Sequence, residues 1–198
     1  GRDLDLAQAA VLRGLRLDLD LVDALGTMRL DGRIEADGVA AGGGSFDTLT
    51  ATARGPLSDL GWAVAGSGTA RPALRLDAAG RLALDRSQAT VARLDATVGP
   101  VEARLAGPAQ VSWAEEAVEL AGLEARVGDG RIEADARVRP GDLTLEATLA
   151  EVPIGPFAAL AGAGIDGSIS GRAQLRGDPA APTGEVRLTL AELREGGL

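Results

Sequence analysis

The residue types that carry out acid–base or nucleophilic chemistry are scarce in this sequence. Its 198 residues include no His, Cys, Tyr, Lys or Asn, which leaves Ser, Thr, Asp, Glu and Arg for chemistry. The adjacent carboxylates of Glu115 and Glu116 are one candidate for a general acid and base of the glycosidase type. Neighbouring residues of a strand point to opposite faces, so these two would not share a site. We therefore predict that the chain is not an enzyme, with no catalytic residues and no cofactor.

Two glycine-rich segments resemble known ligand-binding motifs in part. Residues 42–47 (GGGSFD) resemble one calcium-binding β-roll repeat, but Ser45 stands where that repeat needs glycine and the segment occurs once. Residues 66–69 (GSGT) lack the Lys of a phosphate-binding loop. Both segments are interpreted as turns, and no metal site is predicted.

Composition and charge exclude several further classes. Hydrophobic residues make up 45% of the chain, which excludes a disordered tail, but aromatic residues make up only 2%, so any core is built from Leu, Ala, Val and Ile. The net charge of -9 argues against a nucleic-acid partner, which requires clustered positive charge. Residues 1–6 alternate like a strand and do not resemble a signal peptide, so we expect the sequence to be a segment of a longer protein.

The dominant pattern has a period of two residues. From residue 131 to residue 139 (RIEADARVR), every even position is apolar and every odd position is charged, as in a strand with one apolar face. The same alternation recurs along the chain and predicts about a dozen short strands. The further alternating segments are residues 15–21, 74–84, 101–105, 118–127, 143–149, 169–175 and 186–190.

Turn-forming residues separate these segments, as in a meander of hairpins. Several turns contain Asp-Gly or Gly-Asp, which tolerate positive φ. They include Asp31-Gly32, Gly55-Pro56, Gly99-Pro100, Gly107-Pro108, residues 128–130, residues 140–142 and residues 177–179. A short helix is predicted near residues 155–162, with Pro156 in its first turn and Phe157 closing one edge of the sheet. Residues 7–12 are compatible with another helical turn.

The hexapeptide GRIEAD occurs twice, at residues 32–37 and 130–135, which indicates an internal repeat. We predict a first β-repeat unit over residues 1–110 and a second over residues 111–198. No linker rich in Ser, Pro or charge separates them, so we expect one continuous sheet.

From residue 129 onward the order of features resembles the TamB family, a branch of the AsmA-like lipid-conduit superfamily. An Asp-Gly turn with an alternating strand (129–138) is followed by a second strand (143–149) and an apolar link with two prolines (152–156). The pattern G-x-I-x-G-x-A-x-L-x-G at residues 167–177, a Pro-rich turn at 178–184 and a last strand complete the likeness.

That resemblance implies a large protein anchored in the inner membrane, whose body crosses the periplasm as an elongated, folded-over sheet with an apolar groove, a β-taco. Such proteins are linked to phospholipid movement between the membranes and, with a TamA-like outer-membrane barrel partner, to outer-membrane protein assembly. The membrane anchor and the barrel contact are expected to lie outside these residues. The predicted fold class is therefore all-β, an elongated folded-over sheet with antiparallel or mixed pairing.

The apolar sides of the predicted strands are the candidate lipid-binding residues. A phospholipid with about thirty methylenes would cost on the order of 20 kcal/mol to expose to water, at ~0.8 kcal/mol each, so a continuous trough lowers the barrier to its passage. The alternative interpretation is a structural or adhesive β-repeat of a secreted protein, whose apolar sides pack into a closed core. Trp62 and Trp113 fit either a local core or a lipid contact. The predicted groove lining is Leu17, Leu19, Leu21, Ile34, Leu76, Leu82, Leu84, Leu105, Leu120, Ile132, Val138, Leu143, Leu145, Ile169, Leu175, Val186 and Leu188.

Overall fold

A computed structural model describes residues 10–22, 28–41, 44–70, 72–161 and 163–195. Within these ranges the chain forms thirteen strands, one 3₁₀ helix (η1) and one α-helix (α1). In chain order they are β1 (Ala10–Val22), β2 (Arg29–Ala41), β3 (Gly44–Pro56), β4 (Leu60–Gly68), β5 (Leu74–Ala83), η1 (Leu84–Arg86), β6 (Gln88–Val98), β7 (Val101–Leu105), β8 (Ala109–Ala114), β9 (Ala117–Val127), β10 (Gly130–Arg139), β11 (Asp142–Pro153), α1 (Gly155–Leu160), β12 (Ile165–Gly177) and β13 (Thr183–Glu195).

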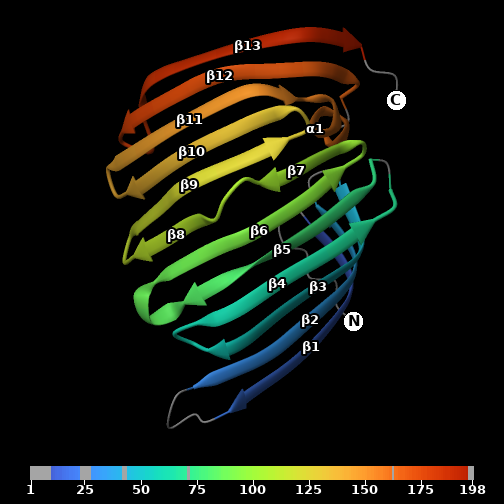
Figure 1. The fold of residues 1–198 in the computed structure, drawn as a ribbon, viewed down its shortest axis with the longest axis vertical. Helices are drawn as coiled ribbons and strands as arrows, with labels where there is room; N and C mark the ends of the chain where they lie inside the picture. Colours follow the sequence, from blue (N-terminus) through green and yellow to red (C-terminus); the bar gives the residue numbers. More distant parts are fainter. Residues whose placement is uncertain (1–9, 23–27, 42–43, 71, 162, 196–198) are drawn as a thin grey trace.

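All the strands belong to one antiparallel sheet whose spatial order follows the chain (Figure 1). Each strand pairs with the next, except that β7 and β8 share one position between β6 and β9. The predicted all-β class is confirmed, and the pairing is antiparallel rather than mixed. Strands on either side of residue 110 belong to the same sheet.

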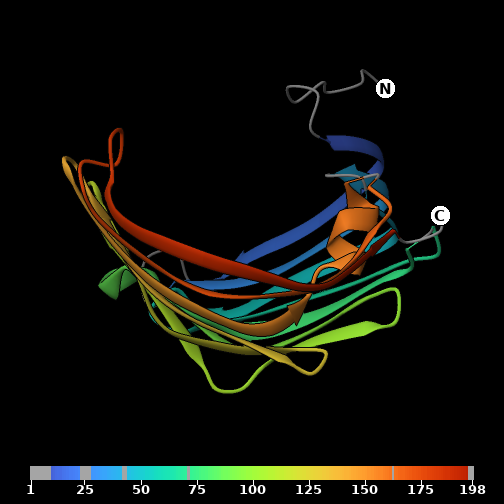
Figure 2. The ribbon, with the colours of Figure 1, turned by 90° about the horizontal axis from the view of Figure 1, so that it is seen from above.

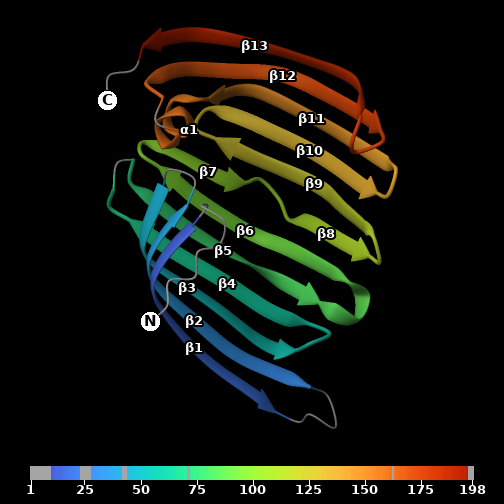
Figure 3. The same ribbon diagram turned by 180° about the vertical axis from the view of Figure 1, so that it is seen from behind.

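The sheet bends into an open trough (Figure 2). The register shifts by one residue in four strand pairs: β5 with β6, β9 with β10, β11 with β12, and β12 with β13. The extra residue lies in β6, β9, β11 and β13, respectively. Such bulges bend a strand and increase its twist. Figure 3 looks into the hollow side, where α1 lies near one end of the strands and the start of β1 curls over the trough together with the end of β2.

Strand register explains why one face of the whole sheet is apolar. Residues directly opposite each other on paired strands project to the same side. One row across the sheet runs from Leu17 through Ile34, Ala51 and Val64 to Ala78. A slip of one residue at any of these pairings would turn the apolar side chains of that strand to the opposite side, so the alternating pattern fixes the register.

This single-layer sheet buries few of its side chains. The buried apolar residues are Ala36, Leu60, Ala78, Ala109, Val127 and Val152, all on the apolar face, and no described side chain is less than 2% exposed. A sheet packed against a second layer buries its large side chains completely. The described part of the chain has no such second layer, so its apolar residues line the hollow rather than a closed core.

The repeated hexapeptide occupies the same structural position twice. Its copies lie in β2 and β10, and each strand forms a hairpin with the next one, β3 or β11. Ile34 lies opposite Ala51 in the first hairpin, and Ile132 lies opposite Leu149 in the second, which is the same register 98 residues further along (132 − 34 = 98; 149 − 51 = 98).

Three local predictions were wrong. Asp31 and Gly32 lie inside β2, where Gly32 leaves room for the Leu19 side chain of β1, and Gly66 lies inside β4 under Phe46. These glycines make space between strands instead of turning the chain. Residues 10–12 belong to β1 rather than to a helical turn, and residues 7–9 lie outside the described ranges, as do Gly42 and Gly43. The short helix was predicted correctly, but Phe157 is 44% exposed and is not sealed into the sheet.

Candidate functional site

The candidate site is the apolar face, defined here as the side of the sheet that carries the row from Leu17 to Ala78. Sixteen of the seventeen predicted lining residues lie on this face, because register connects them across neighbouring strands. The exception is Leu84. It begins η1 at the end of β5, outside the sheet, so it does not continue the row of Leu76 and Leu82.

The apolar face is most exposed at the two edges of the sheet. In β1, Leu15, Leu17, Leu19 and Leu21 are 54–63% exposed. In β13, at the opposite edge, Val186, Leu188 and Leu190 are 52–54% exposed. Exposed apolar side chains are unremarkable when scattered singly, but a contiguous set on one face marks a binding surface.

The sequence did not predict a cluster of large side chains on the apolar face of β3 to β5. A Cβ on Gly66 would lie 2.8 Å from a methyl of Leu49 and 3.0 Å from the Phe46 ring, so these two side chains cover that glycine. A Cβ on Gly80 would lie 2.7 Å from the Trp62 ring, which therefore lies over its cross-strand neighbour. The alternation of Trp62 and Val64 with small residues was the available signal.

Trp113 lies on the same face as Trp62, because it is opposite Val118, which in turn is opposite Val138. Neither tryptophan is buried. A tryptophan that filled a closed core would be buried. Both indoles are therefore placed where a bound chain in the trough would touch them.

In β10 to β12 the apolar face has a central row of small residues. Ala134, Ala147 and Ala173 lie opposite one another on successive strands. The neighbouring row on one side contains Ile132 and Leu149. On the other side it contains Leu145 and Leu175. Larger aliphatic side chains thus stand on both sides of a line of alanines, and the line runs across the strands, along the trough.

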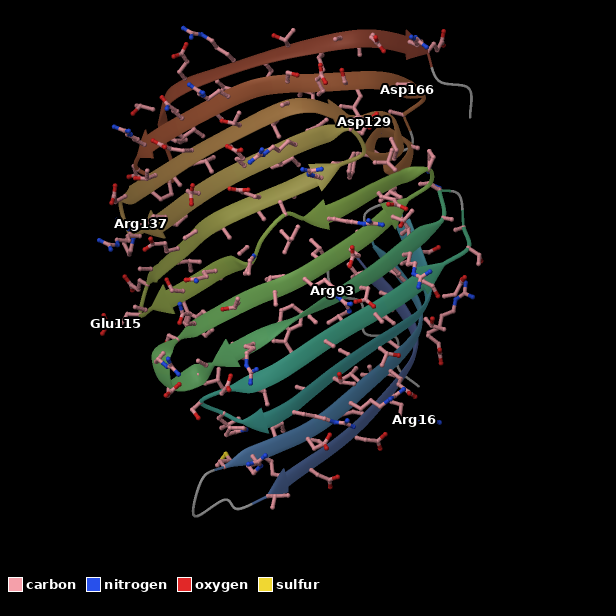
Figure 4. All side chains as sticks on the ribbon, in the orientation of Figure 1. Arg16, Arg93, Glu115, Asp129, Arg137 and Asp166 are labelled. Carbon is pink, nitrogen blue, oxygen red and sulfur yellow. The ribbon has the colours of Figure 1, made fainter. Side chains whose placement is uncertain are left out.

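The opposite side of the sheet, the polar face, carries the charged residues. Arg137 of β10 holds Glu119 of β9 through two hydrogen bonds of 3.2 and 2.9 Å, and Arg81 of β5 holds Asp59 through bonds of 2.5 and 2.7 Å. Figure 4 shows such side chains spread over the whole sheet. Exposed ion pairs of this kind contribute little to the stability of the fold. Their main effect is that the polar face is hydrated while the other face is apolar.

The acidic residues of the described ranges do not gather into a metal site. They contain no group of three or more acidic residues arranged to hold a metal ion. The Arg137 guanidinium, by its hydrogen bonds, lowers the pKa of Glu119, and Glu119 raises the pKa of Arg137 in return. Both groups are exposed members of a cross-strand pair. Within the described ranges, no helix is long and apolar enough to cross a membrane.

No protein-family model, curated protein or solved structure matches this chain. The likeness to the TamB family therefore rests on the sequence features given above. What the geometry adds is an open apolar face that runs from one edge of the sheet to the other.

Asp47 has an internal role that its glycine-rich context did not indicate. Its carboxylate accepts hydrogen bonds from the Thr69 hydroxyl (2.7 Å) and the Thr69 backbone N–H (2.8 Å), which tie β3 to the end of β4. These bonds, the hydroxyl's first, lower the pKa of Asp47 below its usual value. A carboxyl with a lowered folded-state pKa stabilises the fold above its unfolded-state pKa, and this contribution is lost as the pH falls through the folded-state pKa.

We therefore expect Thr69→Ala to raise the pKa of Asp47 back toward its usual value. Carboxyl ¹³C chemical shifts followed through an acid titration measure this directly. Glu119 is the internal control, because its own pKa is held down by Arg137 and should not move in the variant. An unchanged Asp47 titration in Thr69→Ala would show that the hydroxyl bond is not formed in solution.

Proposed function

We propose that this chain is a periplasmic segment of a TamB-like protein, and that its open trough carries phospholipid acyl chains between the inner and outer membranes. The observation that carries the proposal is the uncovered apolar face, which continues across every strand position of the sheet. At about 4.8 Å between neighbouring strands, this face extends for roughly 50 Å.

The physical advantage of such a face is that it contacts acyl chains without a specific pocket. Each methylene removed from water contributes ~0.8 kcal/mol, so a lipid anywhere along the trough keeps part of its hydrocarbon shielded. The described lining is mainly aliphatic with interleaved Gly and Ala, together with the rings of Trp62 and Trp113, so contact with the hydrocarbon and not a set of hydrogen bonds would hold a lipid. A headgroup remains in water at the open side of the trough.

In this proposal the chain does no catalysis and needs no cofactor. Support of outer-membrane protein assembly, the membrane anchor and the contact with a TamA-like barrel belong to parts of the protein outside these residues. The alternative of a structural or adhesive module expects its apolar sides to be packed against one another. Side chains such as Leu17 and Leu188, more than half exposed in a single-layer sheet, favour the conduit over that alternative.

Native mass spectrometry of the chain purified from a Gram-negative periplasm tests the proposal. We expect adducts with the masses of membrane phospholipids, displaced by added detergent. The purified chain should also accelerate transfer of a fluorescent phospholipid between vesicles. A chain that carries no phospholipid and leaves the transfer rate unchanged would overturn the lipid role.

A further inference from the structure

Four glycines of the apolar face each lie directly opposite a large apolar side chain of the neighbouring strand. The pairs are Gly32 with Leu19, Gly66 with Leu49, Gly80 with Trp62, and Gly171 with Leu188. In each pair an atom of the large side chain lies 2.7–3.1 Å from where a Cβ of the glycine would be, so the side chain extends over its glycine. Side chains of a strand usually stand roughly perpendicular to the sheet. These four lie along the floor of the trough instead.

This arrangement makes the trough deeper at the glycines. Two packed sheets lie ~10 Å apart, so one layer of standing side chains takes up about half of that distance, which is close to the thickness of one hydrocarbon chain. Gly32 and Gly66 are themselves buried, although they belong to the open face. A side chain laid over a glycine therefore occupies the space of the missing Cβ and leaves the height above it to a ligand.

Three of the glycines lie in two different rows along the trough. Gly66 belongs to one row, and Gly32 and Gly80 belong to another, which passes through Trp62. The row between these two is the one from Leu17 to Ala78, and it contains no glycine. Gly66 and Trp62 are four positions apart in β4 (66 − 62 = 4), so the two glycine-containing rows are roughly 13 Å apart. Carbon atoms in contact lie ~4 Å apart, so this width takes two hydrocarbon chains side by side, one on each side of the middle row.

We propose that this part of the trough holds the two acyl chains of one lipid side by side, and that the glycines of the two rows give each chain its depth. The inference rests on the proposed function and defines its ligand class more closely, as a lipid with two acyl chains. A single-chain lipid needs depth on only one side of the middle row. A two-chain lipid needs depth on both sides at once, so filling one row should exclude the two-chain lipid and leave the other row to the single-chain lipid.

Gly66→Ala fills one row without a clash with the backbone. The three heavy atoms nearest to the added Cβ belong to the side chains of Leu49 and Phe46, at 2.8–3.2 Å, so these side chains must rise into the trough. Gly80 is unsuitable for the test, because a Cβ there would collide with the backbone carbonyl oxygen of Thr90.

Gly61→Ala is the matched control, because it adds the same methyl group to the polar face of the same strand, β4. The atom nearest to the added Cβ is the backbone carbonyl oxygen of Arg54 at 3.5 Å, which is an ordinary contact distance. This variant should bind both kinds of lipid as the parent chain does.

Cross-saturation NMR of the perdeuterated chain, with protonated Leu and Ala methyl groups, measures which rows the acyl chains touch. Irradiation of the lipid methylenes attenuates the signals of protein methyl groups in contact with them. Leu76 reports on the row of Gly66, and Ala53 reports on the row of Trp62. The probes are dihexanoylphosphatidylglycerol and lauroyl-lysophosphatidylglycerol, each below its critical micelle concentration. They have the same headgroup and the same number of acyl carbons, in two chains or in one.

With the two-chain lipid we expect the parent chain to show attenuation at both Leu76 and Ala53. In Gly66→Ala both effects should be lost, although Ala53 lies in the row that is not filled. With the single-chain lipid, Gly66→Ala should lose the effect at Leu76 and keep it at Ala53. Circular dichroism checks that the strand content of each variant is unchanged.

The outcomes separate this inference from the proposed function. If the two-chain lipid attenuates only one row in the parent chain, or still attenuates Ala53 in Gly66→Ala, its chains do not lie side by side here, and the proposed function stands without the inference. Loss at both methyl groups with the single-chain lipid in a folded Gly66→Ala chain would also contradict the inference, because the row of Ala53 should remain open. A parent chain in which neither lipid attenuates either row would overturn the proposed function and the inference together.

Discussion

Leu145→Arg is expected to remove at least nine-tenths of the phospholipid bound to this chain while leaving it folded. Leu145 lies on the apolar face of the interior strand β11, between Ala136 of β10 and Leu175 of β12. A guanidinium at this position is hydrated when the trough is empty, but an acyl chain laid over it would strip that water. Burying an unpaired charge costs several kcal/mol, and 1.4 kcal/mol already corresponds to a tenfold loss of affinity.

The measurement is the ratio of phospholipid to protein in native mass spectra, together with the thermal unfolding midpoint. Gln174→Arg is the matched control, since it adds the same charge to the polar face of the neighbouring strand and should leave the lipid content unchanged. The two measurements separate the two architectures. A closed core would unfold on Leu145→Arg, whereas an open trough should lose lipid and keep most of its stability. Unchanged lipid content would show that the acyl chains lie elsewhere.

The face of the sheet on which each side chain lies can be predicted from the sequence, because it depends only on the residue's position along its own strand. A period of two residues assigns each side chain to one of two faces, and this chain keeps that period through most of its strands. The alternation predicts that the even positions from Ile132 to Val138 share one face, and they do so in β10. The same alternation places Leu17 of β1 and Leu188 of β13 on this face, although 161 positions separate the end of β1 from the start of β13 (183 − 22 = 161).

The roles of several glycines could not be predicted from the sequence, because they depend on side chains of the neighbouring strand. Asp31-Gly32 has the composition of a hairpin turn, but Gly32 is a strand residue that accommodates Leu19, 3.1 Å from where its Cβ would lie. Gly66 is a strand residue covered by Phe46 and Leu49. A glycine in the sequence can permit a turn, or it can leave room for a side chain of the neighbouring strand. The residue type alone does not distinguish these two roles.

The sequence also does not show whether the apolar face is open or covered by a second layer, and the candidate site depends on its being open. An alternating strand looks the same whether its apolar side faces a second sheet or a hollow. What decides between them is the path of the chain, which extends the sheet strand by strand from β1 to β13 and, within the described residues, does not return to cover the first strands. The bulges add one residue each to β6, β9, β11 and β13, and so small an interruption of the alternation does not show in the sequence pattern.

Gly80→Val should be the most destabilising single substitution at the centre of the trough. Gly80 lies in β5 opposite Trp62 of β4 and Val91 of β6. A Cβ at this position would collide with the backbone carbonyl oxygen of Thr90 and would lie 2.7 Å from the Trp62 ring. Valine adds two further methyl groups, so the strands must separate or the indole must leave the apolar face. Overpacking of this severity costs about 3 kcal/mol or more.

Urea unfolding followed by tryptophan fluorescence measures this loss, and two variants show its cause. Gly107→Ala is the control, because no atom lies within 4 Å of a Cβ built there, and it should change the free energy of unfolding by less than about 0.5 kcal/mol. Trp62→Leu in the Gly80→Val background should restore only part of the stability, since it relieves the clash with the ring but not the clash with the Thr90 carbonyl. Full recovery would mean that β5 and β6 can move apart freely, and a Gly80→Val chain as stable as the parent would contradict the close packing of Trp62 on the floor of the trough.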